Sequence, residues 1–155
     1  MRATIEPPRT APSIRTAATI PVGATEDHGG QKVGPVVLPL DGSALSERAR
    51  PWAVAIARLH QAPLMLMGVV DPYQASTLGL AATAGVPLYD TVVPDAVQEV
   101  TTYLEAQAEE CAKVAPGLQV DARVQVGDTA REILHGSGEV DAQMVVLTTH
   151  GRGGV

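Results

Sequence analysis

The stretch Val36-Val37-Leu38-Pro39-Leu40-Asp41-Gly42-Ser43 decides the fold. Its first five residues form a short apolar run, which is typical of a strand buried on both faces. Asp41-Gly42-Ser43 follows with turn residues, and Ser43 or Ser46 can cap a helix. The stretch therefore predicts a central strand that leads through a tight turn into a helix.

The helix after this turn is predicted from apolar residues at spacings of four and three. They form one stripe that should lie on the sheet: Leu45, Ala49, Trp52, Ile56 and Leu59. Pro51 removes one intrahelical hydrogen bond and should kink this helix about a turn and a half from its start.

The middle of the chain predicts a second strand, a long loop and a second helix. Residues 64–70 are continuously apolar, which suits a strand covered on both faces. Residues 73–92 lack a clear period and are predicted to be a loop, which at this length is usually a lid or a mobile segment. A helix should start at Pro94-Asp95 and stop at Pro116-Gly117. Its predicted buried face comprises Val97, Val100, Leu104, Ala108, Cys111 and Ala115.

The last part of the chain predicts two more strands and a short helix. Residues 120–126 alternate between apolar and polar, as in a half-exposed strand near a sheet edge. Gly127-Asp128-Thr129 should turn the chain into a short helix with Ile133 and Leu134, and residues 144–147 form a fourth apolar strand. Strands that alternate with helices imply right-handed crossovers and a parallel sheet, with ligands outside the carboxyl ends of the strands.

Composition narrows the class of protein. A chain of 155 residues suits one domain, and a net charge of -6 offers no basic field for DNA or RNA. We find no apolar run of the ~18 residues that a membrane span needs and no secretory signal, so a cytoplasmic location is expected. The lone Cys111 cannot form an internal disulfide, and its position on an apolar stripe favours the core over a reactive thiol.

The N-terminal part differs from the rest in composition. Residues 1–32 are rich in Pro, Thr, Ala and Gly without an apolar period, and are predicted to be a disordered tail before a domain at 33–155. A transit peptide is the alternative, because Arg2, Arg9 and Arg15 outnumber nearby acids. The prolines of the segment oppose the amphipathic helix that such a peptide needs.

Two strand ends carry the residues that suit ligand binding. Asp41-Gly42-Ser43 follows the first strand, and Thr148 to Gly154 follows the last. Glycine N–H groups beside a helix N-terminus can hold a phosphate, and the Asp41 carboxylate can accept hydrogen bonds or help hold a cation. The plainer alternatives are a turn with a helix cap at Asp41 and a flexible chain end at Gly151 to Gly154.

Several familiar sites are not supported by the sequence. It contains neither G-x-x-x-x-G-K-[ST] nor G-x-G-x-x-G after the first strand. No Ser-His-Asp or Cys-His arrangement can be argued from spacing. The histidines His28, His60, His135 and His150 are scattered, without metal-ligand spacing.

Four segments taken together resemble the universal stress protein family. They are Val36 to Ala49, Gly68-Val69-Val70-Asp71, Val126-Gly127-Asp128, and Val145 to Gly153, in this order and at suitable separations. The resemblance spans residues 33–155. It implies an α/β fold with a Rossmann-like, doubly wound parallel sheet of the adenine nucleotide alpha hydrolase type. It also implies ATP, with or without magnesium, at the strand ends, and a homodimer for the full-length parent.

The resemblance also assigns roles to residues. Asp41 would lie near the adenosine, Val69 would contact the adenine, Gly151 would meet the phosphates, and Pro39 would shape the pocket. The full set of expected nucleotide-binding residues is Pro39, Asp41, Gly42, Ser43, Val69, Thr148, His150, Gly151 and Gly154. Thr148 stands where ATP-binding members carry a glycine, and the motif's final Gly-Ser, the fifth strand and the last helix are expected to be missing from this chain.

Three functional hypotheses follow. The leading one is a stress-response signalling module that binds ATP or a related adenine nucleotide without catalysing a reaction. The second is a nucleotide-independent dimerisation or partner-binding module of the same fold, which Thr148 favours. The third is an ATP-hydrolysing or nucleotide-transferring enzyme, since a fold does not fix a function.

Residues 1–32 should be dispensable for folding. Because their composition cannot bury enough apolar surface to order the chain, limited proteolysis should remove them first. Deleting them should leave the thermal unfolding midpoint unchanged. A protease-resistant N-terminal fragment, or a large loss of thermal stability on deletion, would contradict the predicted tail.

Overall fold

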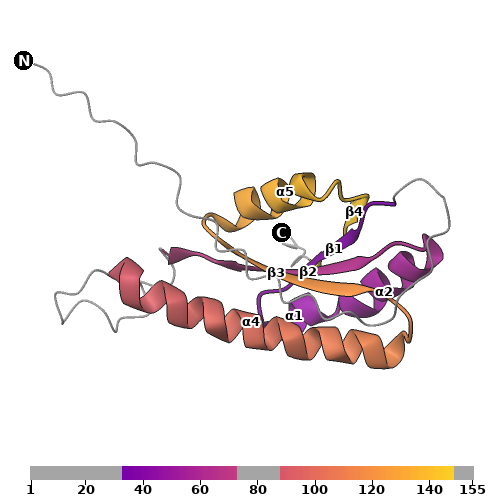
Figure 1. The fold of residues 1–155 in the computed structure, drawn as a ribbon, viewed down its shortest axis with the longest axis horizontal. Helices are drawn as coiled ribbons and strands as arrows, with labels where there is room; N and C mark the ends of the chain where they lie inside the picture. Colours follow the sequence, from indigo (N-terminus) through magenta and orange to yellow (C-terminus); the bar gives the residue numbers. More distant parts are fainter. Residues whose placement is uncertain (1–32, 73–87, 149–155) are drawn as a thin grey trace, which may run out of the picture.

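The structure is a computed structural model that describes residues 33–72 and 88–148. Its helices and strands follow the predicted alternation (Figure 1). In chain order they are β1 (Val36–Pro39), α1 (Ala44–Glu47), α2 (Arg50–Leu59), β2 (Leu64–Val70), α4 (Leu88–Val114), β3 (Val120–Val126), α5 (Thr129–Glu139) and β4 (Met144–Val145). The predicted tail, and the part of the predicted loop at 73–87, lie outside the described residues.

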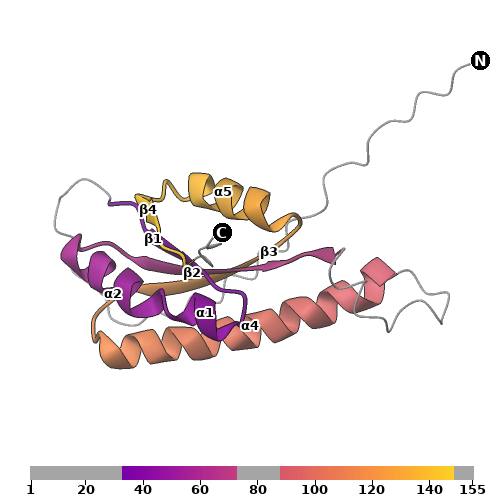
Figure 2. The same cartoon turned by 180° about the vertical axis from the view of Figure 1, so that it is seen from behind.

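The four strands form one parallel sheet in the order β3-β2-β1-β4. Helices α1, α2 and α4 cover one face and α5 covers the other, as the two opposite views show (Figures 1 and 2). The chain moves outward from β1 through β2 to β3 and then returns across the sheet to β4. The carboxyl ends of β1 and β4 are therefore the point at which the winding reverses, which is where open parallel sheets bind ligands. The predicted Rossmann-like, doubly wound fold is confirmed.

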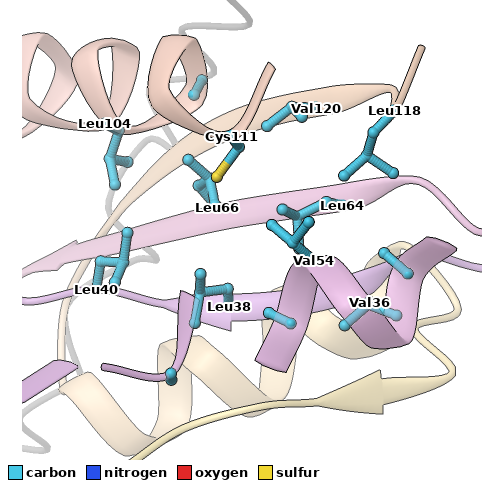
Figure 3. Close-up of a cluster of buried hydrophobic side chains, with 14 of the residues drawn as sticks. Val36, Leu38, Leu40, Val54, Leu64, Leu66, Leu104, Cys111, Leu118 and Val120 are labelled. Atoms are coloured by element: carbon cyan, nitrogen blue, oxygen red, sulfur yellow. The ribbon is translucent and has the colours of Figure 1, made fainter. Parts of the chain in front are cut away.

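The core lies between the sheet and the layer of α2 and α4 (Figure 3). β1 contributes Val36 and Leu38, and β2 contributes Leu64 and Leu66, all fully buried. α4 packs its predicted face against them, with Leu104 and Cys111 inaccessible to solvent. Burial raises the pKa of the Cys111 thiol. Cys111 is therefore a core residue, as predicted.

The predicted first helix is two helices. α1 ends at Glu47 and α2 begins at Arg50, with Pro51 in the first turn of α2. Pro51 has no N–H to continue the hydrogen-bond ladder of α1, but a helix N-terminus needs no such donor. The proline therefore divides the helix instead of kinking it.

The predicted apolar stripe of this helix was wrong at two positions. Trp52 is 69% exposed and Leu59 is 80% exposed. The buried face of α2 instead carries Ala53, Val54 and Ala57. Residues 52–57 are all apolar, so the sequence does not single out one face of α2, and the face with the smaller Ala53 and Ala57 side chains packs on the sheet.

Two other element boundaries also differ from the prediction. α4 begins at Leu88 and includes Pro94, whereas the sequence predicts a start at Pro94. β4 pairs with β1 only at Met144 and Val145, whereas the sequence predicts a strand over residues 144–147. Val146 donates its N–H to the Val37 carbonyl at 2.9 Å, so the backbone N–H and C=O groups of the odd-numbered residues of β1 point towards β4. Pro39 is the next odd-numbered residue. Because it has no N–H, the hydrogen bonding between β1 and β4 ends there.

Gly68 allows α4 to lie close to β2. A Cβ placed on Gly68 would lie 2.4 Å from Cγ1 of Val100 and 3.3 Å from Cδ1 of Leu104. A distance of 2.4 Å is far inside van der Waals contact, so any side chain at position 68 would push α4 outward. The glycine therefore sets the spacing between the sheet and its longest helix.

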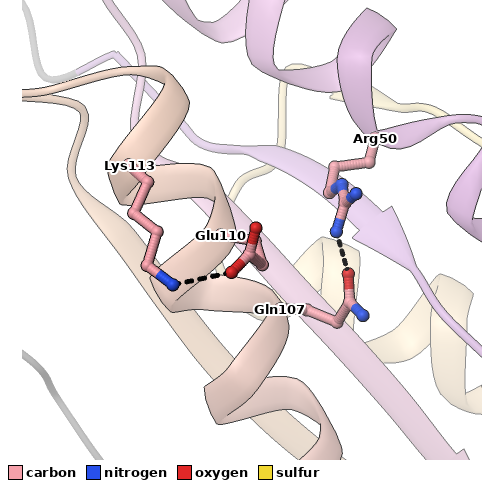
Figure 4. Close-up of polar contacts among 4 residues, drawn as sticks. All are labelled: Arg50, Gln107, Glu110 and Lys113. Carbon is pink, nitrogen blue, oxygen red and sulfur yellow. Dashed lines mark hydrogen bonds and ion pairs between the residues drawn. The ribbon is translucent and has the colours of Figure 1, made fainter.

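A polar network joins α1 and α2 to α4. The Tyr103 hydroxyl donates to Oε1 of Glu47 at 3.1 Å, and Gln107 Nε2 donates to the same oxygen at 3.3 Å. Oε1 of Gln107 in turn accepts from Arg50 (Figure 4). The nearby Glu110–Lys113 pair, at 2.7 Å, is exposed within α4 and contributes little. The Tyr103–Glu47–Gln107–Arg50 network therefore holds the short helix α1 in place on α4.

Replacing Gly68 by alanine should destabilise the protein by about 1–3 kcal/mol, because the added methyl group overpacks the interface between α4 and β2. Urea unfolding measures the change. Gly138→Ala is the control, since a Cβ there meets no atom within 4 Å and helix propensity should make it about 1 kcal/mol more stable. A Gly68→Ala variant as stable as the parent would contradict the close approach of α4.

The Tyr103 phenol should lose its proton only at a pH well above the usual value for tyrosine. Burial, followed by the hydrogen bond to Glu47 and the charge of Glu47, raises the pKa of Tyr103 from 10.0 to about 12. The neutral phenol therefore contributes stability that is complete below pH 10.0 and is lost as the pH rises through about 12. The difference in tyrosinate absorbance between the parent and Tyr103→Phe should have its midpoint near pH 12, and Glu47→Gln should lower that midpoint. A midpoint near 10.0 would contradict the network.

Candidate functional site

A cleft of about 860 Å³ lies at the carboxyl ends of β1, β2 and β4. Its volume is within the range of about 300–1,000 Å³ that is usual for small-molecule sites. The residues that follow the strands form its floor, α4 forms one wall, and the start of α5 closes another side. The lining comprises Pro39, Leu40, Asp41, Gly42, Ser46, Met67, Val69, Val70, Asp71, Ala96, Glu99, Val100, Tyr103, Thr129, Ile133, Leu147 and Thr148.

Asp41 is held in one orientation by the turn after β1. Its Oδ1 accepts a hydrogen bond from the Ser43 N–H at 2.9 Å, and Gly42 has a φ of 79°, which favours glycine. Ser43 caps α1, because its Oγ accepts from the Ser46 N–H at 3.1 Å. Hydrogen bonds from Ser43, through its side chain and its backbone N–H, lower the pKa of Asp41. The carboxylate is therefore ionised and fixed at the cleft.

The described lining of the cleft is acidic. It carries the carboxyl groups of Asp41, Asp71 and Glu99, and none of its described residues is Lys, Arg or His. Such a surface attracts hydrogen-bond donors and cations and repels bare phosphate.

The hydroxyl groups of the lining reinforce this preference, because three of them donate their protons within the protein. Ser46 Oγ donates to the Ser43 carbonyl at 2.9 Å, Thr148 Oγ1 donates to the Leu45 carbonyl at 2.8 Å, and Tyr103 donates to Glu47. Each hydroxyl can therefore offer a ligand only its lone pairs. A matching ligand presents N–H or O–H donors, as the hydroxyls of a ribose and the amino group of adenine do.

Many of the residues predicted for this site do meet at the cleft. Pro39, Asp41, Gly42, Val69 and Thr148 line it, from three different strand ends. Ser43 is adjacent and orients Asp41. His150, Gly151 and Gly154 lie outside the described residues.

Sequence reasoning missed the wall that α4 provides. Ala96, Glu99, Val100 and Tyr103 lie at helical spacings of three and four and all line the cleft. Asp71 was missed as well, although it directly follows β2. The position of Asp71 at a strand end and the four-residue spacing of Glu99 and Tyr103 were available signals.

Two further features of the described ranges bear on the class of protein. Within residues 33–72 and 88–148, no cluster of three or more His, Cys, Asp or Glu side chains is arranged to hold a metal ion. None of the helices in those ranges is both long and apolar enough to cross a membrane.

Known proteins match both the sequence and the fold. A model of the universal stress protein family matches residues 32–155. A curated universal stress protein of Mycolicibacterium smegmatis (strain ATCC 700084 / mc(2)155) is 32% identical over 122 residues, which cover 76% of this chain. The match spans only 38% of that relative's length.

Solved structures show the same fold. A protein from the universal stress protein family of Burkholderia pseudomallei has a TM-score of 0.60 at 23% identity, covering 78% of this chain and 85% of its own. A universal stress protein in complex with cAMP has a TM-score of 0.52 at 21% identity, covering 81% of this chain and 79% of its own. With the fold, the strand-end cleft and the family model in agreement, the chain belongs to the universal stress protein family.

Proposed function

We propose that the cleft binds an adenine nucleotide, with ATP as the expected ligand, and that the protein acts as a stress-response signalling module. The observation that carries this proposal is the ionised Asp41 carboxylate. It is held at the carboxyl end of β1, next to β4, where the direction of winding of the sheet reverses. The structural relative in complex with cAMP supports a nucleotide at this fold.

The nucleoside end of the ligand suits the described part of the cleft. Asp41 would accept hydrogen bonds from ribose hydroxyls, and Val69 would contact the adenine. Val70, Val100 and Ile133 offer further apolar surface around the base. Because the described lining is acidic, the phosphates should point away from Asp71 and Glu99. We propose that Gly151 meets the phosphates, as the family resemblance implies. Magnesium would arrive with the phosphates and reduce their repulsion from the carboxylates.

Three hydroxyl groups of the cleft have no neighbour that would activate them as nucleophiles, which favours binding without catalysis. Ser46 and Thr148 donate to backbone carbonyls, which cannot accept a proton as a general base does. Tyr103 has a pKa of about 12 and stays protonated. These groups are therefore not activated as nucleophiles, and we propose a role in binding and signalling in the cytoplasm.

A second candidate function is partner binding without nucleotide, including homodimerisation of the parent protein. The observation that favours it is the exposure of Trp52 and Leu59 on one helix, α2. Sedimentation and isothermal titration with ATP, on the parent and on a Trp52→Ser, Leu59→Ser variant, distinguish the two functions. If the protein binds partners through α2, sedimentation should show a changed assembly state in the variant. If it acts by binding nucleotide, titration should show an unchanged affinity for ATP.

Replacing Asp41 by alanine should weaken ATP binding by about ten- to a hundredfold, because a charge-assisted hydrogen bond is worth roughly 1.5–3 kcal/mol. Isothermal titration with ATP and magnesium measures the change, with circular dichroism as the folding control. Gly151→Val should weaken binding as well, because the family resemblance assigns Gly151 to the phosphates and valine would add branched carbons there.

Asp121→Ala is the matched control for Asp41. Asp121 is a carboxylate near the start of β3, away from the cleft, and accepts a hydrogen bond from Gln119 at 3.1 Å. Its replacement should leave the affinity unchanged. If folded Asp41→Ala binds ATP as tightly as the parent, the site is elsewhere; if the parent binds no nucleotide, partner binding becomes the leading function.

A further inference from the structure

Thr148 links two parts of the cleft that are far apart in sequence. Its Oγ1 donates a hydrogen bond of 2.8 Å to the Leu45 carbonyl, across 103 residues, and the contact is partly buried. Thr148 follows β4, whereas Leu45 lies in α1, directly after the Asp41 turn. Both segments contribute to the lining of the cleft.

The Leu45 carbonyl is accessible to Thr148 because α1 is short. Leu45 accepts the Arg48 N–H at 3.1 Å, and the Ala49 N–H bonds to Ser46 rather than continuing an α-helical ladder from Leu45. A carbonyl oxygen has two lone pairs, so one remains for a partner from outside the helix. The hydroxyl of Thr148 takes this place, and a glycine at position 148 could not.

The helix that Thr148 holds also supports Asp41. Ser46 is next to Leu45, and its Oγ accepts a hydrogen bond from the Asp41 N–H at 3.4 Å. The Ser46 N–H donates to Oγ of Ser43, which caps α1. Ser43 in turn donates its N–H to the Asp41 carboxylate. A displacement of α1 would therefore move the carboxylate that we assign to the ligand.

We propose that Thr148 is a positioning residue of the nucleotide site. Its hydroxyl fixes α1, and through Ser43 and Ser46 the Asp41 carboxylate, relative to the end of β4. This inference rests on the proposed nucleotide function for its effect on affinity, but the contact itself can be tested without a ligand.

The first measurement is ATP affinity, by isothermal titration with magnesium. Thr148→Val keeps the branched shape and removes the hydroxyl, so we expect about three- to tenfold weaker binding. Thr148→Ser keeps the hydroxyl and should bind within about twofold of the parent. Retained affinity in folded Thr148→Val, or equal weakening in Thr148→Ser, would overturn the proposal.

Thr101→Val is the matched control, because the Thr101 hydroxyl also donates to a backbone carbonyl, that of Val97, at 2.7 Å in a partly buried position. Thr101 does not line the cleft. This control removes the same kind of hydroxyl at a site outside the cleft and should keep its affinity for ATP. If Thr101→Val weakens binding equally, the effect of Thr148 is general destabilisation and the proposal is wrong.

The second measurement is amide hydrogen exchange in the protein without nucleotide. Thr148→Val should speed exchange at residues 44–49, and Thr101→Val should not. If the parent binds no ATP, the proposed function fails while this result still tests the contact. Unchanged exchange at residues 44–49 in Thr148→Val would overturn the positioning role.

Discussion

The position of β1 in the middle of a parallel sheet is the constraint on which the rest of this structure depends. All four of its residues pair with β2 on one side, Val36 and Val37 pair with β4 on the other, and Val36, Val37 and Leu38 are buried. A parallel strand must be reached by a crossover, so the helices are forced onto the faces of the sheet. The crossovers to β2 and to β4 lie on opposite faces, which places the Asp41 turn and Thr148 together.

The chemistry of the cleft follows from how its polar groups are satisfied. The Ser46 hydroxyl donates its proton to the Ser43 carbonyl, and the Thr148 hydroxyl donates to the Leu45 carbonyl in α1. The Tyr103 hydroxyl donates to Glu47. These three hydroxyls therefore offer a ligand only lone pairs, and the Asp41 carboxylate adds further acceptors. The same hydrogen bonds that hold the short helix α1 therefore also favour a ligand rich in N–H and O–H donors, such as a nucleoside.

The sequence predicted the features that depend on local pattern and missed those that depend on packing between elements. The apolar runs at residues 36–40 and 64–70 correctly predicted β1 and β2. The alternation at residues 120–126 correctly predicted a strand near the edge of the sheet. The exposure of Trp52 was missed because α2 is apolar on more than one face, and the sequence does not show that the face with Ala53 and Ala57 packs on the sheet. Glu99 and Tyr103 were missed because a helix period shows that residues share a face without showing what that face meets.

The central claim is that an adenine nucleotide binds at the strand ends where Asp41 and Thr148 meet. The most direct measurement is a titration of the isotope-labelled chain with ATP and magnesium, followed by NMR of the backbone amides. We predict that the largest shifts fall on residues 41–46, 69–71 and 148. Shifts confined to the opposite end of the sheet, near Pro63 and Val120, or no shifts at saturating ATP, would contradict the assignment of this cleft.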